Sequence, residues 1–523
     1  MNTTEIIIVG TIFAYLIVMV TVGFIFSKKN DNVGDFYLGG RKLGPLVTAM
    51  SAEASDMSSW LLMGLPGVAY LTGGAEASWT AIGLAIGTYL NWLFIAKRLR
   101  VYSQRCGAIT IPDFFSARYR DKSKVLMGVS ALIILIFFVP YTASGFSACG
   151  KLFSSLFGWD YHVAMIISAV IIISYTCTGG FLAASTTDLI QSIIMTVALI
   201  SIVIFGINAA GGLGNVIDNA NSLEGYFSLS HIHNTETLGA DKYSLLTIAS
   251  ILAWGLGYFG MPHILLRFMA IEDKNKIKTS RRIASVWVVI SMGVAIFIGF
   301  IGNALSRSGK IEVLTSSDSE KIVIKIAQYM SEHHIGLAIV AGLVFAGILA
   351  CTMSTSDSQL LAASSSMSEN ILKGVFNVKM SDKASMLVAR SVLLVIAVLG
   401  IALAWDKDSS VFRVVSFAWA GFGATFGPVM LASLFWKRSN KYGAVAGLIV
   451  GAVMVFVWKY AVELADLLGI GLSQEAKDLF SIYELLPAFI CAFIAIVVVS
   501  LLTKAPDKEI TDEYNSVKTE MNK

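Results

Sequence analysis

Long apolar runs separated by short charged segments are the feature that most constrains the fold of this 523-residue chain. A helix needs about 17–25 apolar residues to cross a bilayer. Stretches of that kind lie at 5–27, 45–73, 79–96, 125–150, 162–183, 189–210, 244–262, 283–305, 335–360, 384–405, 411–435, 442–464 and 482–503. Only 14% of the residues are charged, against about 25% in a globular domain. Because the runs do not alternate with period two, a transmembrane β-barrel is excluded. The sequence predicts an all-α polytopic membrane protein with about 13 transmembrane helices in a single integral membrane domain.

The basic residues between these spans predict an orientation. They are concentrated in alternate loops: Lys28, Lys29, Arg41 and Lys42 in the first, eight cations between 97 and 124, Arg267, Lys274, Lys276, Lys278, Arg281 and Arg282 in the seventh, and Lys437, Arg438 and Lys441 in the eleventh. Loops rich in Lys and Arg stay in the cytoplasm. We therefore expect the N-terminus outside and the polar tail 504–523 in the cytoplasm, with that tail disordered because it has little to bury.

Two spans are interrupted by residues that break helices. The second, 45–73, has Asp56 and several serines in its middle, followed by Pro66 between two glycines; the seventh, 244–262, has three glycines and Pro262. Open backbone inside a bilayer is tolerated only where it lines a cavity enclosed by protein. Broken segments in two halves of opposite orientation indicate the midplane site of a secondary transporter, although no residue-level repeat is visible between the halves.

Asp56 is the first candidate site residue. A carboxylate in the middle of a span costs about 2.5–3.5 kcal/mol on insertion scales, so it needs a cation, a hydrogen-bond partner or water. A structural, hydrogen-bonded aspartate is the alternative. The surrounding hydroxyl side chains and freed carbonyl groups favour a small cation such as Na⁺. Glu53 is either a second functional carboxylate or a neighbour of the water-filled break.

Hydroxyl side chains in the ninth span form a second candidate group. Ser354 and Thr355 are adjacent, so their hydroxyls leave the helix about 100° apart and could bind a cation between this helix and the broken second span. The alternative is that each bonds back to a carbonyl of its own helix. Asp357 is a further carboxylate in this span whose role the sequence leaves open.

Aromatic residues near the breaks are the third candidate group. Trp254, Tyr258 and Pro262 follow each other at intervals of four, which predicts one helix face. Trp60 stands four residues after Asp56, and Tyr141 lies within the fourth span. Trp and Tyr often mark the membrane boundary instead. Their position beside the breaks favours an apolar cage for a small organic solute. No nucleotide-binding loop, catalytic triad, zinc motif or haem motif accompanies them, so we expect neither an enzyme nor an organic cofactor.

Several of these segments resemble those of the sodium/solute symporter family, and within it the sodium/proline symporters. The resemblance covers about residues 5–505. It is carried by FYLGGRKLGP (36–45), SAEASDMSSWLLMGLPG (51–67), IPDFF (111–115), GGFLAASTTDLIQ (179–191), AWGLGYFGMPHILLRFMA (253–270), MSTSDSQLLAASS (353–365) and AWAGFGATFGPV (418–429). One departure is Ser59, where the proline symporters favour glycine.

The resemblance implies a leucine-transporter-like core of two inverted five-helix repeats, 45–210 and 244–436, and Na⁺-coupled uptake of L-proline across the cell membrane. It implies a Na⁺ site made of backbone carbonyls and hydroxyls: Ala54, Met57, Cys351, Ser354 and Thr355. It implies a proline site formed by Trp60, Tyr141, Trp254, Tyr258 and Pro262. Asp56 and Ser58 match residues important for binding both solutes, and Arg41 and Asp188 match functional positions nearer the cytoplasm.

Three other functions stay open on the sequence alone. The first is symport of another small solute, such as a different amino acid or pantothenate. The second is a transporter-like membrane sensor, although no output domain follows Leu502. The third is a membrane-embedded enzyme, which the lack of a paired acid and base or of a metal motif in the spans disfavours. No nucleic acid and no obligate protein partner are expected.

Overall fold

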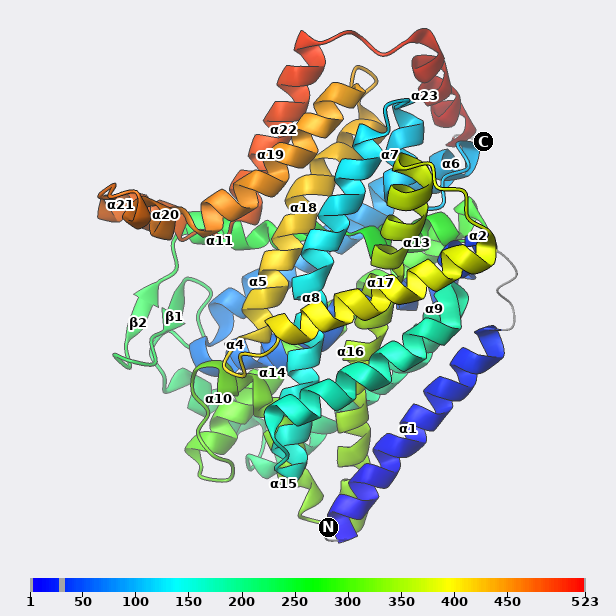
Figure 1. Ribbon diagram of the computed structural model, residues 1–523. Coiled ribbons are helices and arrows are strands. Elements are labelled where there is room, and N and C mark those ends of the chain that lie inside the picture. The colour runs from blue at the N-terminus through cyan, green and yellow to red at the C-terminus, as the bar shows by residue number, and fades with distance from the viewer. Residues whose placement is uncertain (1–2, 28–32, 522–523) are drawn as a thin grey trace.

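The structure is a computed structural model that describes residues 3–27 and 33–521, and it is almost wholly helical (Figure 1). Its first half contains α1 (Thr3–Ser27), α2 (Val33–Leu38), η1 (Gly39–Arg41), α3 (Pro45–Ser59), η2 (Trp60–Gly64), α4 (Leu65–Thr72), α5 (Gly74–Leu90), η3 (Asn91–Ile95), α6 (Ala96–Arg105), α7 (Ile111–Arg118), α8 (Val125–Phe157), α9 (Tyr161–Ala209), α10 (Leu213–Asn221) and the strands β1 (His231–His233) and β2 (Ala240–Lys242). Lys28 and Lys29, which contributed to the predicted orientation, lie outside the described residues.

The second half begins with the broken seventh span and ends with a helix beyond the last apolar run. It contains α11 (Leu245–Leu252), α12 (Trp254–Gly257), α13 (Pro262–Ala270), η4 (Lys274–Lys276), α14 (Ile277–Arg307), η5 (Ser316–Lys321), α15 (Ile322–Ser331), α16 (Ile335–Ser365), η6 (Ser366–Val375), α17 (Asp382–Leu403), α18 (Val411–Phe435), α19 (Lys441–Lys459), α20 (Ala461–Leu467), α21 (Gln474–Phe480), α22 (Leu485–Leu502) and α23 (Lys508–Met521). The strands β1 and β2 form a short antiparallel hairpin.

Every predicted span overlaps a helix or a broken pair of helices. The fifth and sixth spans are continuous in α9, where only Gly180 leaves the helical conformation, with φ 66° and ψ −177°. Within residues 3–27 and 33–521, ten helices are long and apolar enough to cross a membrane, or eleven if α11–α13 is counted as one span bent by 42°. The all-α membrane architecture is therefore confirmed, whereas the count of thirteen spans stays a prediction.

Two expectations from the sequence are wrong. The tail is not wholly disordered: α23 is a helix with buried Ile510 and Val517 that packs against α6. Arg267 is not a loop residue, because the helix that begins at Pro262 continues to Ala270 and Arg267 is buried within it. The tail was expected to be disordered because it has few apolar residues, yet Ile510 and Val517 are buried in α23. Arg267 was assigned to a loop because a charged residue was taken to end an apolar segment, yet it is paired inside the bundle.

The broken helices lie in the centre of the bundle. The helix α16 packs against α9, α3, α8 and α1, and α14 packs against α3, α4 and α5. The helices α5 and α12 cross at Gly87 and Gly255, where a Cβ on Gly87 would lie 2.3 Å from the Gly255 carbonyl oxygen. Such a backbone contact has no room for a side chain, so these glycines set the position of the second broken helix.

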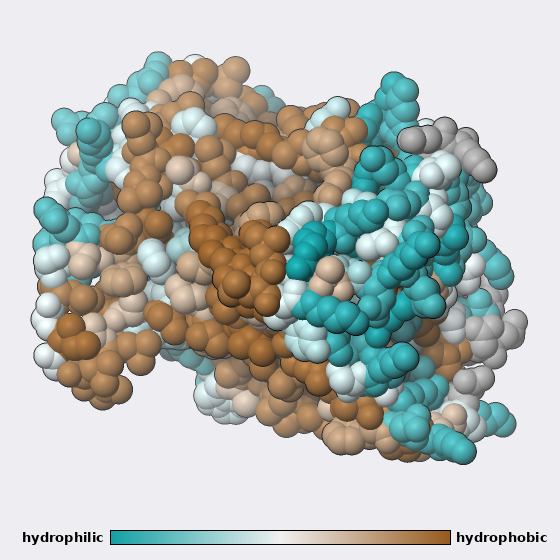
Figure 2. Space-filling view, turned by 90° about the horizontal axis from the view of Figure 1, so that it is seen from above, coloured by the Kyte–Doolittle hydropathy of each residue, from teal (hydrophilic) through white to brown (hydrophobic). Residues whose placement is uncertain are grey.

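The outer surface matches a bilayer. Figure 2 shows a broad hydrophobic band between hydrophilic regions at the two ends of the molecule. The outer helices carry many exposed apolar side chains, for example Ile17, Val170, Leu394 and Ile494. In Figure 1 the two ends of the chain lie at opposite ends of the bundle: α15 lies at the end of the N-terminus, and α6, α7 and α23 lie at the end of the C-terminus.

Candidate functional site

The first break in the bundle lies at the end of α3. Ser58 has φ 44° and ψ −172°, a conformation that interrupts the helix and that residues other than glycine rarely adopt. A π-helical turn, η2, follows and leads into α4. The Ser58 hydroxyl oxygen accepts a hydrogen bond from the Trp60 N–H at 3.1 Å, so the side chain caps one donor that the break frees. The predicted interruption of this span is present at Ser58.

The second break lies between α12 and α13. The chain leaves the helix after Gly257 and enters α13 at Pro262, after Met261 in an extended conformation. Gly260 is required here because a Cβ would lie 2.3 Å from the Phe422 carbonyl oxygen. The expectation that Trp254, Tyr258 and Pro262 share one continuous helix face is therefore wrong.

The two breaks meet at Asp56. The Tyr258 hydroxyl donates a hydrogen bond to Asp56 Oδ2, and the Tyr141 hydroxyl donates to the Asp56 carbonyl oxygen at 3.2 Å. All three side chains are buried. The buried carboxylate thus has a hydrogen-bond partner from the second broken helix, which offsets part of the cost of removing it from water. The α8 residue Tyr141 binds the backbone of Asp56 instead.

Indole and phenyl rings surround this contact. The ring centroid of Trp60 lies 5.6 Å from that of Trp254 and 5.9 Å from that of Phe412. Trp419 donates from Nε1 to the Trp254 carbonyl oxygen at 2.8 Å, and its ring lies edge-on to Tyr258 at 5.1 Å. Asp56, Met57, Trp60, Leu84, Tyr141, Trp254, Val415 and Trp419 line a cavity of about 10 Å³. That volume is about one water molecule, so a larger solute requires the rings to move apart.

Oxygen atoms gather where α3 approaches α16. The Ser354 hydroxyl donates to the Ala54 carbonyl oxygen at 2.8 Å and lies 3.1 Å from the Cys351 carbonyl oxygen. Thr355 Oγ1 is buried and has no hydrogen-bond partner in the part of the chain that the structure describes. Met57 is buried and directly precedes Ser58, where the helix is interrupted. A small hard cation prefers oxygen ligands. This group offers neutral oxygens, of which Thr355 Oγ1 lacks a hydrogen-bond partner among the described residues.

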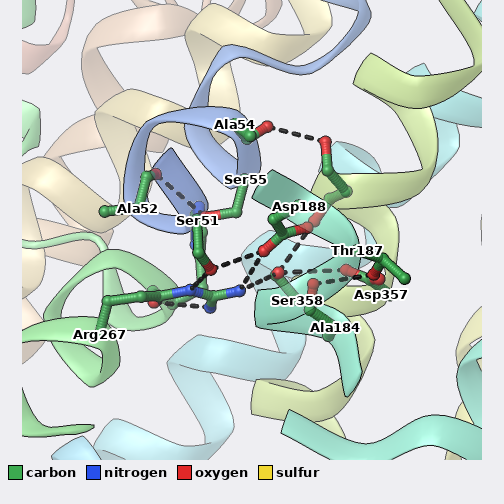
Figure 3. Close-up of polar contacts among 12 residues, drawn as sticks. Ser51, Ala52, Ala54, Ser55, Ala184, Thr187, Asp188, Arg267, Asp357 and Ser358 are labelled. Atoms are coloured by element: carbon green, nitrogen blue, oxygen red, sulfur yellow. Dashed lines mark hydrogen bonds and ion pairs between the residues drawn. The ribbon is translucent and has the colours of Figure 1, made fainter. Parts of the chain in front are cut away.

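A buried charged cluster lies beside these oxygens (Figure 3). Asp188 Oδ2 accepts from the Ser51 hydroxyl at 2.6 Å and from Arg267 Nη2 at 3.2 Å. Arg267 also donates to Ser51 Oγ and to Ser358 Oγ. Ser358 lies 3.1 Å from Asp357 Oδ1. Arg267 and Asp188 are both at most 1% exposed, so this ion pair joins α13, α9, α3 and α16 in the interior.

Arg41 lies apart from Asp56. Its guanidinium donates to the Met269 and Ala108 carbonyl oxygens at 2.7 and 2.6 Å and to Ser103. These contacts join the segment before α3 to α6 and to the end of α13. The structure therefore places Arg41 at the end of the bundle that carries α23, outside the small cavity at Asp56.

Two further predicted residues have clear neighbours. Glu53 Oε1 accepts from Trp92 Nε1 at 3.0 Å, whereas Oε2 has no partner within the described residues. Pro262 occupies the first turn of α13, where its missing N–H costs no helical hydrogen bond. It does not line the small cavity at Asp56.

Sequence reasoning missed four residues that complete the site: Arg267, Phe412, Trp419 and Trp92. A signal existed for Trp419, because it lies within the AWAGFGATFGPV segment that carried the family resemblance. Arg267 also lies within such a segment, AWGLGYFGMPHILLRFMA, but an isolated Arg after an apolar run is typical of a cytoplasmic loop, and this misled the assignment. Phe412 and Trp92 had no signal beyond their aromatic character.

Comparison with known proteins gives a consistent result. Residues 36–451 match the Sodium:solute symporter family. The chain is 41% identical to the high-affinity proline transporter PutP of Bacillus subtilis (strain 168), over 96% of this chain and 100% of the relative. It is 42% identical to the sodium/proline symporter of Escherichia coli (strain K12), over 96% and 95% of the two chains. A third relative is the osmoregulated proline transporter OpuE of Bacillus subtilis (strain 168), at 40% identity over 94% of each chain.

Solved structures agree on the fold. A Na⁺-coupled sialic acid symporter in a substrate-bound outward-open state superposes with a TM-score of 0.77 at 20% identity, over 96% of this chain and 99% of the other. MhsT in complex with L-phenylalanine gives a TM-score of 0.54 at 14% identity, over 88% and 98% of the two chains. At these identities the likeness concerns the fold alone, and it supports the leucine-transporter-like architecture.

Proposed function

The chain belongs to the sodium:solute symporter family, and from this premise we propose that it imports L-proline together with Na⁺. One observation carries the proposal: the two broken helices meet through Tyr258 and Asp56, between a set of oxygens and a set of aromatic rings. A neutral zwitterion with a compact apolar ring needs apolar walls and few polar anchors. The relatives at 40–42% identity are named for proline transport.

The proposed Na⁺ ligands are the carbonyl oxygens of Ala54, Met57 and Cys351 and the hydroxyls of Ser354 and Thr355. The Ser354 hydroxyl already lies against two of these carbonyls, and the unpartnered Thr355 hydroxyl supplies a free lone pair. When Na⁺ binds, the Ser354 proton turns away from the Ala54 carbonyl so that both oxygens face the ion. Asp56 and Ser58, which flank Met57, contribute negative charge and the open backbone.

The proposed proline site adjoins the cation site. Trp60, Tyr141, Trp254 and Tyr258 form its walls, and Pro262 begins the helix whose N–H groups attract the carboxylate of the solute. Asp56 would attract its amine. Since the cavity measures about 10 Å³, binding requires Trp60 and Trp254 to separate. That movement is the step in which alternating access opens the site to one side of the membrane.

Coupling to Na⁺ supplies enough free energy for uptake. One positive charge that moves through 100 mV gains about 2.3 kcal/mol. At about 1.4 kcal/mol for each factor of ten, this corresponds to an accumulation of about 50-fold before any Na⁺ gradient is counted. A neutral solute adds no charge, so one Na⁺ for each proline suffices.

The proposal includes an arrangement in the membrane. The two inverted repeats comprise 45–210 and 244–436, and each begins with one broken helix. The end that carries α6, α7 and α23 faces the cytoplasm, because the basic residues between 97 and 124 lie there. Arg41 and Asp188 act nearer that side, where their contacts with α6 and α13 restrain the inward path.

Uptake of radiolabelled proline into proteoliposomes tests the function. We expect accumulation with Na⁺ outside and little with K⁺ outside. Excess unlabelled proline should compete, whereas pantothenate and unrelated amino acids should not. Competition by one of those solutes instead would assign the transporter to that solute, and equal uptake in K⁺ would remove Na⁺ coupling.

A further inference from the structure

A pocket lined by basic side chains lies outside the transport site. Lys97, Lys274, Lys278 and Arg281 line a cavity of about 240 Å³, together with Trp92, Leu93, Asn275 and Ile277. These residues come from η3, the start of α6, η4 and the first turns of α14. We call the four cations the basic pocket. They lie at the end of the bundle that carries α23, where α6 and α23 are neighbours (Figure 1).

The cations of the basic pocket form no salt bridge with carboxylates of the described residues. Across residues 3–27 and 33–521, no ion pair joins any of the four cations to Asp or Glu. Lys97 and Lys274 donate to the Met521 and Glu520 carbonyl oxygens at 2.9 and 2.8 Å. Those acceptors are neutral, so the pocket keeps the positive charge that attracts an anion.

Arg281 has a hydrogen-bond donor that the described residues do not satisfy. Its guanidinium lies over the Tyr89 ring at 5.2 Å, and its buried Nε atom has no hydrogen-bond partner among the described residues. A buried donor that lacks a partner costs free energy. An anionic oxygen in the cavity would accept from this group and from the nearby ammonium groups at once.

The surroundings identify the source of the anion. Leu93 lines the pocket, and Ile82 and Ile86 precede it on α5. These three side chains are 38%, 37% and 52% exposed, and we call them the apolar ridge. Figure 2 shows that a hydrophobic band of the surface adjoins the hydrophilic end of the molecule. A free phosphate ion makes no favourable contact with an apolar ridge. A phospholipid can place its acyl chains along the ridge and its phosphate at the boundary between the apolar and the hydrophilic surface.

We propose that the basic pocket binds an anionic phospholipid of the cytoplasmic leaflet, with its phosphate among Lys97, Lys274, Lys278 and Arg281 and its acyl chains along Ile82, Ile86 and Leu93. Basic pockets between transmembrane helices on the cytoplasmic side are suited to such head groups. With four cations, the pocket favours a head group with two phosphates over one with a single phosphate. This inference does not depend on which solute the protein transports.

The test is a lipid titration of the full-length protein purified in detergent. Native mass spectrometry counts bound cardiolipin and, in parallel, bound phosphatidylcholine with the same acyl chains. We expect preferential retention of one cardiolipin molecule. Removing two cations at about 1 kcal/mol each should weaken cardiolipin binding by Lys278→Gln/Arg281→Gln about 30-fold, with phosphatidylcholine binding unchanged.

Two further variants make the test specific. Lys122→Gln/Lys437→Gln removes two exposed cations from other loops at the same end and should leave cardiolipin binding unchanged. Lys278→Arg/Arg281→Lys keeps the charge and should retain binding, which separates loss of charge from loss of folding. Equal binding of both lipids, an equal loss in the Lys122→Gln/Lys437→Gln control, or displacement of the lipid by inorganic phosphate would each overturn the proposal.

Discussion

The break after α3 and the break after α12 differ in how the chain leaves the helix. At the first break a single residue, Ser58, takes a positive φ, and helical structure resumes immediately in η2. At the second break the chain is extended at Met261, and the helices before and after it are bent by 42°. The first break is a local interruption, whereas the second changes the direction of the helix.

The two breaks also present different chemistry. The first exposes backbone beside a carboxylate, and α3 meets the Ser354 hydroxyl at the Ala54 carbonyl oxygen. The second carries Trp254 and Tyr258, whose rings face Trp60 and Trp419. Oxygens suit a cation and rings suit an apolar solute. We therefore propose that each broken helix serves mainly one of the two solutes and that the contact between Asp56 and Tyr258 couples them.

The largest expected effect on transport is at Asp56, where the two breaks meet. Asp56→Asn keeps the size of the side chain and removes its charge, so it should lower Na⁺-driven proline uptake about 100-fold at limiting Na⁺, since hydrogen bonds and contacts to a charged group are worth about 1.5–3 kcal/mol. Uptake into vesicles, normalised to the amount of protein in the membrane, measures the effect. Asp218→Asn, at an exposed position of α10, is the control. Uptake by Asp56→Asn at the wild-type level would end the assignment.

Arg267 follows, because it ties the segment after the second break to the segment before the first. Arg267→Gln leaves Asp188 as a buried carboxylate without its cation, which typically costs about 3–5 kcal/mol. The thermal unfolding temperature of the purified variant should fall clearly. Lys276→Gln, which removes an exposed ion pair with Glu272, should change it little. If Arg267→Gln unfolded at the same temperature as the wild type, the ion pair would not hold the two helices together.

The sequence predicted the membrane architecture because crossing a bilayer requires long apolar helices, and those are visible without any partner. It also located both breaks, since a bilayer tolerates a carboxylate, glycines and prolines within an apolar run only where the protein encloses them. Asp56 followed from the same argument, whereas Ser354 was a candidate because its hydroxyl stands beside that of Thr355 in the ninth span. The positions of individual spans could therefore be predicted mainly from local composition.

Contacts between distant segments were beyond sequence reasoning. Arg267 and Asp188 are 79 residues apart, and nothing near Arg267 indicates that its helix continues past Pro262 with a carboxylate opposite. Helix α23 did have a local signal: Ile510 and Val517 are seven residues apart, on one helix face. Its stability depends on packing against α6, which composition does not show.

A smaller effect concerns the oxygens on the side of the first break. If Thr355 Oγ1 binds Na⁺, Thr355→Ala should raise the Na⁺ concentration for half-maximal uptake at least about tenfold, because a ligand to a charged group is lost. Thr355→Ser keeps the hydroxyl and should stay close to the wild type. The control is Thr352→Ala, since the Thr352 hydroxyl donates to the Ile348 carbonyl of its own helix. Equal Na⁺ dependence of Thr355→Ala and Thr352→Ala would assign Thr355 a structural role.

The smallest effect is expected for the rings on the side of the second break. Trp254→Ala removes one wall of the cavity and its contacts with Trp60 and Trp419. Aromatic pairs contribute about 0.5–1.5 kcal/mol beyond the area that they bury. The variant should therefore bind labelled proline about tenfold more weakly, with a smaller change in apparent Na⁺ affinity at saturating proline.

Variants at Tyr258 separate the ring from its hydroxyl group. Tyr258→Phe keeps the ring and loses the hydrogen bond to Asp56. We therefore compare two quantities in each variant: the loss of proline affinity and the change in the Na⁺ dependence of proline binding. The ratio of the second to the first should be larger in Tyr258→Phe than in Tyr258→Ala. Some effect on both solutes is required, because coupled sites influence each other reciprocally. Trp159→Ala, at a ring that is 47% exposed, is the control for an aromatic residue at the outer surface. Trp254→Ala would contradict the proposal if it lowered only the yield of folded protein and the surviving protein bound proline normally. Trp254 would then be a packing residue, and the division of the two solutes between the two breaks would fail.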